Sequence, residues 1–387
     1  MSNYYLALVF ITITSMVVSI IHFRENHTLS RNVRQQLVFI AFFIILGVIC
    51  ECIGICLNSS TLPNTKAIHQ VIKAIEFTVT PLIPAFYTRI IESKNIKKSI
   101  RILIKGPLIL NAFLEFSNIF LSYIFYIDKN NVYQHGTFYI VYILIYCMEI
   151  CIFIFALLKH TKRYQIRNIA TLISILTFLL IGLSIRMIDS SVNSDWIVVA
   201  ITYLLFVIYY SDLSLKVDPL TGLLNRKSYE DRIRKLDYTT AFIIMDVNNF
   251  KQINDQMGHT VGDLFLKLIA DTIVENYRKY GYCYRIGGDE FCVILKSGVL
   301  EKISPKGTIA VYSELLDNLN KNFDDLILAH SEEHPSLRYG VSKGYSFYFA
   351  NNNQNFFYEN SPEYFLNIKK AIDAADKMLY FDKKRKK

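Results

Sequence analysis

The stretch Arg285-Ile286-Gly287-Gly288-Asp289-Glu290-Phe291 decides how the second half of this chain folds. It lies between two apolar or aromatic segments, 281–284 and 292–295, and the polar turn between them predicts a β-hairpin with acids at its tip. Its two glycines lack Cβ atoms, so a bulky ligand can approach this backbone closely. Adjacent carboxylates on a turn repel each other unless a cation lies between them, so the tip predicts half of a hard-metal site.

The other half of this site is predicted upstream, where an apolar strand ends. Residues 241–245 (Ala-Phe-Ile-Ile-Met) form an unbroken apolar run, which is typical of a strand buried on both faces, and Asp246 follows directly. If this strand lies beside the hairpin, the carboxylates of Asp246 and Asp289 meet, with the carbonyl oxygen of Val247 nearby. Oxygen donors of this kind hold Mg²⁺, which in turn holds phosphates.

Several motifs in residues 218–387 resemble the GGDEF family, the diguanylate cyclases that condense two GTP molecules into cyclic di-GMP. Residues 287–291 give the motif of the family's name intact. The family's opening signature is matched by 218–223 with Asn225-Arg226. Its metal and guanine segment is matched by 246–255 with Gly258-His259 and Gly262-Asp263. Its closing helix is matched by 375–377 with Leu379-Tyr380 and Lys383.

The fold and the reaction follow from this resemblance. It implies the ferredoxin-like palm that the family shares with adenylate cyclases and polymerases. The sequence patterns predict a helix capped by Asn225, then a strand, a helix that Gly281 can end, the hairpin, a helix and a strand, which is also the order of an α+β fold. The 3′-hydroxyl of one GTP would attack the α-phosphate of the other and expel pyrophosphate, a reaction that depends on positioning and charge neutralisation. Because one domain holds one GTP, the resemblance implies a homodimer.

The resemblance also assigns roles to individual residues. The metal ligands for Mg²⁺ or Mn²⁺ are Asp246, the Val247 carbonyl, Asp289 and Glu290. Asp289 and Glu290 are the catalytic candidates, and the choice of general base between them stays open. The residues expected to bind substrate are Asn254 and Asp263 at the guanine edge, His259 near the same nucleotide, Lys251 and Lys383 at the phosphates, and Gly287 and Gly288 in the turn.

Three positions depart from the family pattern. Asn248 stands where the metal segment usually has a second acid. The family's inhibitory Arg-x-x-Asp is absent, because Arg278 is followed by Gly281 at the place of the acid, so feedback inhibition at that site is not expected. The closing helix lacks the usual Ala and Gly-Arg around Lys383, which makes its phosphate contacts less secure.

Composition divides the 387-residue chain into a membrane half and a soluble half. Hydrophobic residues make up 52% and aromatic residues 14% of the chain, and the excess lies before residue 212. We expect a multi-pass helical sensor domain at 1–211, a short linker at 212–217 and the cyclase domain at 218–387. The net charge of +9 is ascribed to cytoplasmic loops, and no nucleic-acid partner is expected. The seven predicted spans in the lipid bilayer are 4–23, 36–57, 67–90, 102–126, 136–158, 168–188 and 195–211.

Loop charges predict the orientation of these spans. The first stretch has no basic n-region and is interpreted as a spanning helix, not a signal peptide. Basic residues favour the cytoplasmic side, which places the N-terminus outside and the cyclase domain inside. Those in the odd-numbered loops are Arg24, Arg31, Arg34, Lys94, Lys97, Lys98, Arg101, Lys159, Lys162, Arg163 and Arg167.

Charged residues inside the predicted spans suggest a sensor. Charges in hydrocarbon cost at least ~2.5 kcal/mol each at the centre, so they normally face a bundle interior and pair. Two interpretations stay open: a pocket for a small-molecule or membrane signal, or a structural ion-pair cluster. The residues of this candidate pocket are Glu51, Lys73, Glu76, Glu115 and Arg186.

Other classes of function are less well supported by the sequence. The seven cysteines form no C-x-x-C pair and have no histidine at ligand spacing, so neither a zinc site nor a disulfide framework is indicated. One alternative is a catalytically silent domain that binds GTP or cyclic di-GMP. The intact residues 287–291 together with Asp246 argue against it. Another is a transporter-like or channel-like module, for which no internal repeat is evident.

Overall fold

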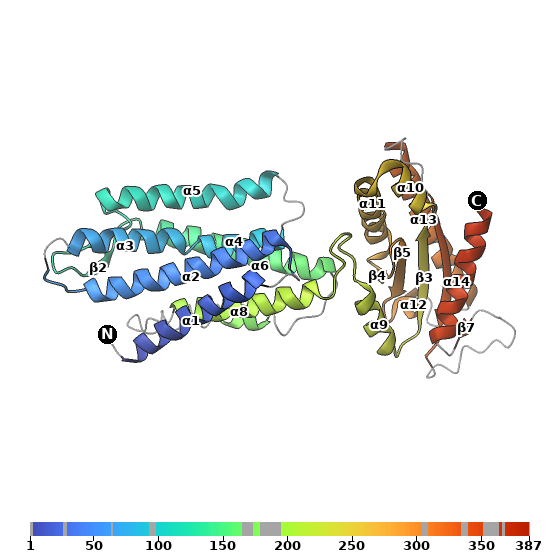
Figure 1. Ribbon diagram of the computed structural model, residues 1–387, viewed down its shortest axis with the longest axis horizontal. Coiled ribbons are helices and arrows are strands. Elements are labelled where there is room, and N and C mark those ends of the chain that lie inside the picture. Colours follow the sequence, from blue (N-terminus) through green and yellow to red (C-terminus); the bar gives the residue numbers. More distant parts are fainter. Residues whose placement is uncertain are drawn as a thin grey trace. The chain divides into compact units, whose positions relative to one another are not determined.

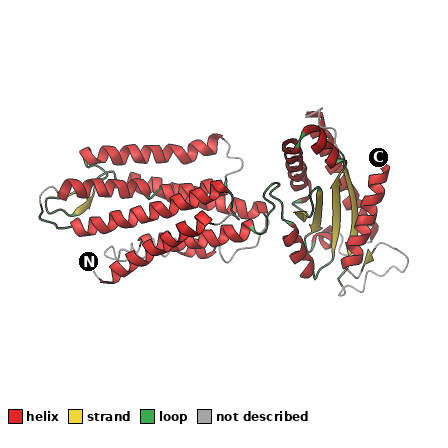
Figure 2. Cartoon of the chain, in the orientation of Figure 1, coloured by secondary structure: helices red, strands yellow, loops and turns green. Residues whose placement is uncertain are grey.

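The chain forms two compact units, Met1–Asp212 and Leu213–Lys387, each of which is described by itself (Figure 1). The computed structural model describes residues 3–25, 29–62, 65–92, 98–164, 173–178, 195–303, 309–333, 340–350, 364–365 and 368–386. The residues named above that lie outside these ranges are Lys94, Lys97, Arg167, Arg186 and most of 168–188. In Figure 2 the described part of the first unit is helical apart from one small hairpin, whereas the second has a sheet covered by helices.

Long apolar helices make up most of the N-terminal unit. A short antiparallel pair of strands, β1 (Phe125–Ile127) and β2 (Tyr133–His135), connects two of them. The helices of its described residues are α1 (Asn3–Glu25), α2 (Arg31–Leu57), α3 (Thr65–Val79), α4 (Leu82–Ile91), α5 (Lys98–Leu121), α6 (Tyr139–Tyr164) and α8 (Asp195–Ser214).

Five helices in the described part of this unit, namely α1, α2, α5, α6 and α8, are long and apolar enough to cross a membrane. The expectation of seven spans is therefore not confirmed. The run 67–90 is two helices, because residues 80 and 81 separate α3 from α4, and the run 168–188 lies mostly outside the described residues. The run 102–126 is also too long, since α5 ends at Leu121 and β1 begins at Phe125.

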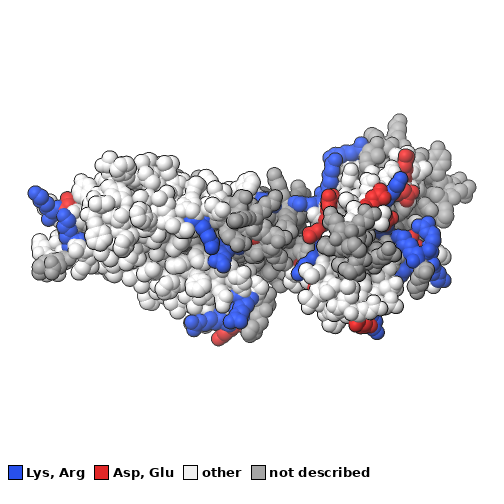
Figure 3. Space-filling model, turned by 90° about the horizontal axis from the view of Figure 1, so that it is seen from above, with Lys and Arg blue, Asp and Glu red and all other residues white. Residues whose placement is uncertain are grey.

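The surface of this unit suits a lipid environment. Phe113, Phe116 and Phe120 of α5 are 66–75% exposed, while the opposite side of the same helix buries Asn111, Glu115 and Asn118. Such a helix places its apolar side chains outward, the reverse of a helix in a water-soluble protein. Lys, Arg, Asp and Glu are sparse on the face of this unit shown in Figure 3.

A proline explains the break between α3 and α4. Pro81 has no backbone N–H, so the carbonyl oxygen of Phe77 loses the donor that a continuous helix would provide. The side-chain amide of Asn111 on α5 donates to that oxygen at 3.1 Å. The break is thus repaired by a neighbouring helix, as buried backbone in a membrane requires.

The described residues of the C-terminal unit form a five-stranded sheet of order β4-β5-β3-β6-β7, antiparallel except for the parallel β6–β7 pair. The strands are β3 (Thr240–Val247), β4 (Gly281–Arg285), β5 (Glu290–Leu295), β6 (Val341–Tyr348) and β7 (Tyr364–Phe365). The helices are α9 (Arg226–Arg234), α10 (Phe250–Met257), α11 (His259–Tyr277), α12 (Val299–Ile303), α13 (Ile309–Glu333) and α14 (Ile368–Arg385). The central strand β3 is buried along its whole length, as its apolar run predicts.

The two faces of this sheet differ in what they carry. The main core lies on one face, where side chains such as Ile243 and Met245 pack with α11 and α13. Asp246 and Glu290 alternate with core residues and belong to the other face, against which α14 packs. That packing is close at Gly344 of β6, because a Cβ there would lie 2.1 Å from the carbonyl oxygen of Ala375.

Most local predictions in this unit are confirmed. Asn225 caps α9 by accepting from the backbone N–H of Ser228 at 3.0 Å, and the hairpin forms as β4 and β5. One prediction is wrong, because Gly281 does not end α11, which stops at Tyr277 with Arg278 as its cap. The helix expected between the hairpin and the next strand forms as the 25-residue α13, over the weakly patterned region 311–328.

Candidate functional site

The sheet brings the hairpin tip to the end of the central strand. In the antiparallel pairing of β3 with β5, Asp246 lies directly opposite Glu290. The backbone N–H of Val247 donates to the carbonyl oxygen of Asp289 at 3.2 Å. The two stretches that the sequence predicts to share a site are therefore neighbours.

A network of hydrogen bonds fixes the shape of the tip. The backbone N–H groups of Ile286 and Gly287 both donate to the carbonyl oxygen of Glu290, at 2.9 and 3.3 Å. The guanidinium of Arg285 donates to the carbonyl oxygen of Gly288 at 2.7 Å. The turn is thus held by its own backbone and by one flanking side chain.

The guanidinium of Arg285 also ties the tip to the opening motif, a contact that the sequence reasoning missed. It donates to the carboxylate of Asp218 at 3.1 Å, and the hydroxyl of Thr221 donates to the same oxygen at 2.6 Å. Burial alone would raise the pKa of Asp218, but these donors outweigh it, and the pKa lies below its ordinary value of 3.8. The opening motif therefore helps to hold the hairpin turn in place through the ion pair of Asp218 with Arg285.

The two glycines of the turn have different surroundings. A Cβ on Gly287 would lie 2.4 Å from a carboxylate oxygen of Glu290 and 3.1 Å from its Cβ. A Cβ on Gly288 would meet nothing within 4 Å. The open side of the turn at Gly288 is where a ligand can approach the backbone.

Asp246 carries the most constrained carboxylate of the site. It is 8% exposed, and the ammonium of Lys383 on α14 lies 2.6 Å from one of its oxygens. Burial raises the pKa of Asp246, Lys383 opposes this, and the charge of Asp289 adds to the rise. Lys383, expected at the phosphates of a nucleotide, lies instead on a predicted metal ligand.

Helix α14 contributes a further acid that the sequence reasoning did not assign. Burial and the nearby charges of Glu290 and Asp373 raise the pKa of Asp376. The signal was present, because Asp376 belongs to the segment 375–377 that resembles the closing helix of the family. Asp246, Asp289 and Glu290 thus lie where β3 meets the hairpin, and Asp376 interacts electrostatically with Glu290.

These oxygen donors suit Mg²⁺ in kind. Carboxylates and a strand-end carbonyl are the ligands that hard divalent cations take, and the open side at Gly288 leaves room beside them. In the described part of the chain, however, no three acidic, histidine or cysteine side chains converge on one point. The structure thus shows the donors of a metal site with the ammonium of Lys383 among them.

The residues expected to recognise guanine lie on α10 and at the start of α11. Asn254 is half-buried, and its side-chain oxygen lies against Gly262, where a Cβ would be 2.0 Å away. His259 and Asp263 are exposed on the same turn-and-a-half of α11, and Lys251 is exposed on α10. Close packing of Asn254 on Gly262 brings these two helices together.

Asn248, at the departure from the family pattern, has a structural role. Its side-chain oxygen accepts from the hydroxyl of Ser342 at 2.7 Å, and its backbone N–H donates to the carbonyl oxygen of Gly340 at 2.9 Å. These bonds join the end of β3 to the start of β6. Asn248 therefore links the ends of these two strands beside the site.

In the N-terminal unit, three of the five candidate sensor residues lie together. The ammonium of Lys73 is 2.8 Å from Glu76, and both interact electrostatically with Glu51, which accepts from the hydroxyl of Tyr5 at 2.8 Å. Glu115 is fully buried elsewhere on α5, and neither of its carboxylate oxygens has a hydrogen-bond partner among the described residues. Arg186 lies outside them.

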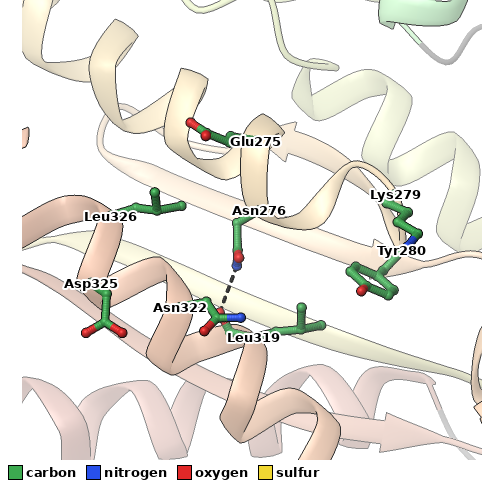
Figure 4. Close-up of a pocket in the computed structure, with 8 residues that line it drawn as sticks. All are labelled: Glu275, Asn276, Lys279, Tyr280, Leu319, Asn322, Asp325 and Leu326. Atoms are coloured by element: carbon green, nitrogen blue, oxygen red, sulfur yellow. Dashed lines mark hydrogen bonds between the residues drawn. The ribbon is translucent and has the colours of Figure 1, made fainter. Parts of the chain in front are cut away.

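An open groove of about 550 Å³ lies between α11 and α13, away from the hairpin tip (Figure 4). The side-chain amide of Asn276 donates across it to the carbonyl oxygen of Leu319 at 2.7 Å, which bonds the two helices. None of the predicted site residues lines it. Its lining is Glu275, Asn276, Lys279, Tyr280, Leu319, Asn322, Asp325 and Leu326.

Comparisons with known proteins identify relatives of the C-terminal unit. Residues 215–387 match the family described as "Diguanylate cyclase, GGDEF domain". The probable diguanylate cyclase DgcJ of Escherichia coli is 46% identical over 85 residues, which are 20% of this chain and 17% of that protein. Diguanylate cyclase DgcS of Shewanella oneidensis is 36% identical over 105 residues, 25% of this chain and 36% of that protein. Diguanylate cyclase DgcZ of Escherichia coli is 29% identical over 147 residues, 36% of this chain and 47% of that protein. The chain therefore spans less than half the length of each of these relatives.

Proposed function

We propose, on the premise that residues 215–387 are a GGDEF domain of the diguanylate cyclase family, that this protein condenses two GTP into cyclic di-GMP and releases two pyrophosphates. The observation that carries the proposal is the junction of β3 with the hairpin tip. There Asp246 faces Glu290 across the sheet, and Asp289 bonds Val247 through the backbone.

The residues at the hairpin tip and the end of β3 are assigned separate roles in this reaction. Bound Mg²⁺ would neutralise the phosphate charge in the transition state. Asp246, the Val247 carbonyl, Asp289 and Glu290 are the proposed ligands, and Asp289 or Glu290 accepts the proton of the attacking 3′-hydroxyl. Gly288 gives the nucleotide its open approach to the turn.

Recognition of GTP is assigned to the helices beside the tip. Asn254 and Asp263 would hydrogen-bond the edge of guanine, where the base carries N–H donors that adenine lacks. His259 lies near these two residues, on α11. Lys251 and Lys383 would bind phosphates. Asn254 is held for this task by its close packing on Gly262.

The two substrates require two copies of the chain. Each domain holds one GTP, so we propose a symmetric homodimer in which two hairpin tips face each other. The N-terminal unit is the proposed place where a signal controls that encounter.

We further propose that the N-terminal unit is a seven-span sensor in the cell membrane, with its N-terminus outside and the GGDEF domain in the cytoplasm. The five long apolar helices and the outward aromatic side chains of α5 support insertion into a membrane. The group formed by Glu51, Lys73 and Glu76 is the candidate sensor.

The test is product formation by the full chain in nanodiscs with GTP and Mg²⁺, analysed by chromatography and mass. We expect cyclic di-GMP from the wild type and from Asp325→Ala, a control in the groove between α11 and α13. Asp289→Ala should yield none. GTP binding without product in the wild type would overturn the enzyme and favour a silent binding domain.

A further inference from the structure

The ion pair between Lys383 and Asp246 involves one of the proposed metal ligands. It joins the last turns of α14 to the end of the central strand, at a carboxylate that is only 8% exposed. The lysine side chain itself is 38% exposed, so its ammonium reaches the carboxylate from the solvent side. The pair therefore sits at the mouth of the proposed metal site.

The backbone that carries Lys383 is firmly held. Gly344 lets α14 approach β6 so closely that a Cβ there would lie 2.3 Å from the backbone nitrogen of Leu379. One turn later, Asp382 accepts from the backbone N–H of Lys343 at 3.0 Å and pairs with Lys386 at 2.8 Å. This anchoring fixes the Cα of Lys383, and only its flexible side chain is free to change partner.

The other basic residues at this end of α14 have different contacts. Lys386 also donates to the carbonyl oxygen of Val341 at 2.9 Å, and Arg385 pairs with Asp382 at 3.0 Å. The ammonium of Lys384 lies 4.5 Å from the centre of the Tyr380 ring. Among these four basic residues, Lys383 alone pairs with Asp246.

The charges around Asp246 explain why a cation is needed there. Asp289 interacts with Asp246 electrostatically, and Glu290 lies opposite it in the sheet. Acids gathered at a partly buried site repel one another, and a cation among them removes that repulsion. In this structure the cation is the ammonium of Lys383.

We propose that Lys383 is a resident counter-ion of Asp246, which must leave that carboxylate before a divalent metal can bind. The inference rests on the proposed function, because the metal and GTP are those of the cyclase reaction. With a metal–nucleotide complex bound, Asp246 would serve as a metal ligand and the ammonium of Lys383 would pair with a phosphate. The metal alone offers the lysine no new partner, so metal and nucleotide bind cooperatively.

The first test measures Mn²⁺ binding to the full chain in nanodiscs without nucleotide, from the electron paramagnetic resonance of free Mn²⁺. Lys383→Met keeps most of the length of the side chain and removes its charge. We expect it to bind Mn²⁺ at least about tenfold more tightly than the wild type, since a charge this close shifts ionic equilibria by one to three powers of ten. The matched control, Lys384→Met, should bind like the wild type.

A double variant locates the gained affinity. Lys383→Met combined with Asp246→Asn should lose the tight binding that Lys383→Met alone gains. If the double variant keeps it, the metal binds elsewhere and the proposal is wrong. Unchanged or weaker Mn²⁺ binding by Lys383→Met would overturn it as well, because a purely structural ion pair would change only the thermal unfolding midpoint.

The second test measures the exchange itself. Mn²⁺ affinity is compared with and without a GTP analogue whose α–β bridge is not cleaved. The analogue should tighten Mn²⁺ binding by at least about tenfold more in the wild type than in Lys383→Met, because only the wild type has a displaced ammonium to offer the phosphates. Equal gains would contradict the exchange.

These readouts are independent of catalysis. If the wild type makes no cyclic di-GMP but the Mn²⁺ results hold, the proposed function fails and the counter-ion role stands. If product forms while Lys383→Met binds Mn²⁺ like the wild type, the function stands and the counter-ion role fails.

Discussion

At the scale of single residues, the chemistry of this site depends on side chains whose partners are not adjacent in sequence. The Arg285 guanidinium donates to the carbonyl oxygen of Gly288 and to the carboxylate of Asp218. Asp218 and Arg285 are 67 residues apart in the chain. A motif shows that such residues are present. Only the folded sheet shows which of them touch.

The ion pair between Asp218 and Arg285 should be lost in acid. The pKa of Asp218 is held below 3.8 in the folded state, so its contribution to stability is present above pH 3.8 and is lost as the pH falls through the folded pKa. Asp218→Asn should therefore flatten the fall in the thermal unfolding midpoint between about pH 5 and pH 3. Asp325→Asn, in the groove, is the control and should leave that slope as in the wild type.

Asn248 predicts a difference between two substitutions. Asn248→Asp keeps an oxygen for the hydroxyl of Ser342, whereas Asn248→Ala removes the bond and should cost about 1 kcal/mol of unfolding free energy. Pulse proteolysis in urea measures this difference. Equal losses in the two variants would show that the Ser342 bond is not what matters.

Two glycines of the C-terminal unit with opposite surroundings give a matched pair. Gly344→Ala places a Cβ against the backbone of α14 and should destabilise the unit by about 1–3 kcal/mol. Gly288→Ala meets no atom within 4 Å and should leave stability unchanged while it weakens GTP binding. Pulse proteolysis and nucleotide affinity, measured on both variants, separate packing from ligand approach.

At the scale of elements, the sequence predicts what has a strong local pattern. The apolar run before Asp246, the cap at Asn225 and the two segments around the hairpin turn each give the element expected. The order of elements predicts a helix between the hairpin and β6, but the local pattern does not give the bounds of α13. Val311 to Leu328 contains charged and amide side chains spread around the helix, and the helix packs on α11.

The same reasoning explains the error in the third apolar run. Hydropathy alone gives one long span over 67–90, since Thr80 and Pro81 barely lower its average. The backbone is nevertheless interrupted there, because proline removes a helix donor. Sequence averages detect how apolar a segment is and not whether its hydrogen bonds are continuous.

The site shows a similar division between what can and cannot be predicted. That Asp246 lies beside the hairpin tip follows from the pattern of strands. That Lys383 pairs with Asp246 does not, because it depends on the packing of α14 against β6 over a close glycine contact. Side-chain pairing between distant elements is decided by tertiary packing.

At the scale of the whole molecule, the proposed topology makes a prediction about access. The turn at Asn130 between β1 and β2 should face the outside, and Lys384 should face the cytoplasm. In a cysteine-free background, Asn130→Cys should react with a membrane-impermeant maleimide on intact cells, and Lys384→Cys only after lysis. The opposite pattern would invert the orientation and place the GGDEF domain outside.

The need for two GTP-bearing domains makes a second prediction at this scale. Nanodiscs that hold two chains should form product at a much higher rate per chain than nanodiscs that hold one, measured at the same total protein concentration. Equal rates would show that one chain suffices and would contradict the symmetric dimer.

The repaired break in the N-terminal unit bears on how movement could pass through it. Because Asn111 of α5 replaces the missing donor at Phe77, a slide of α5 past α3 by one helical turn, about 5.4 Å, would strand a polar carbonyl in an apolar interior. This hydrogen bond therefore holds α3 and α5 in register at the break.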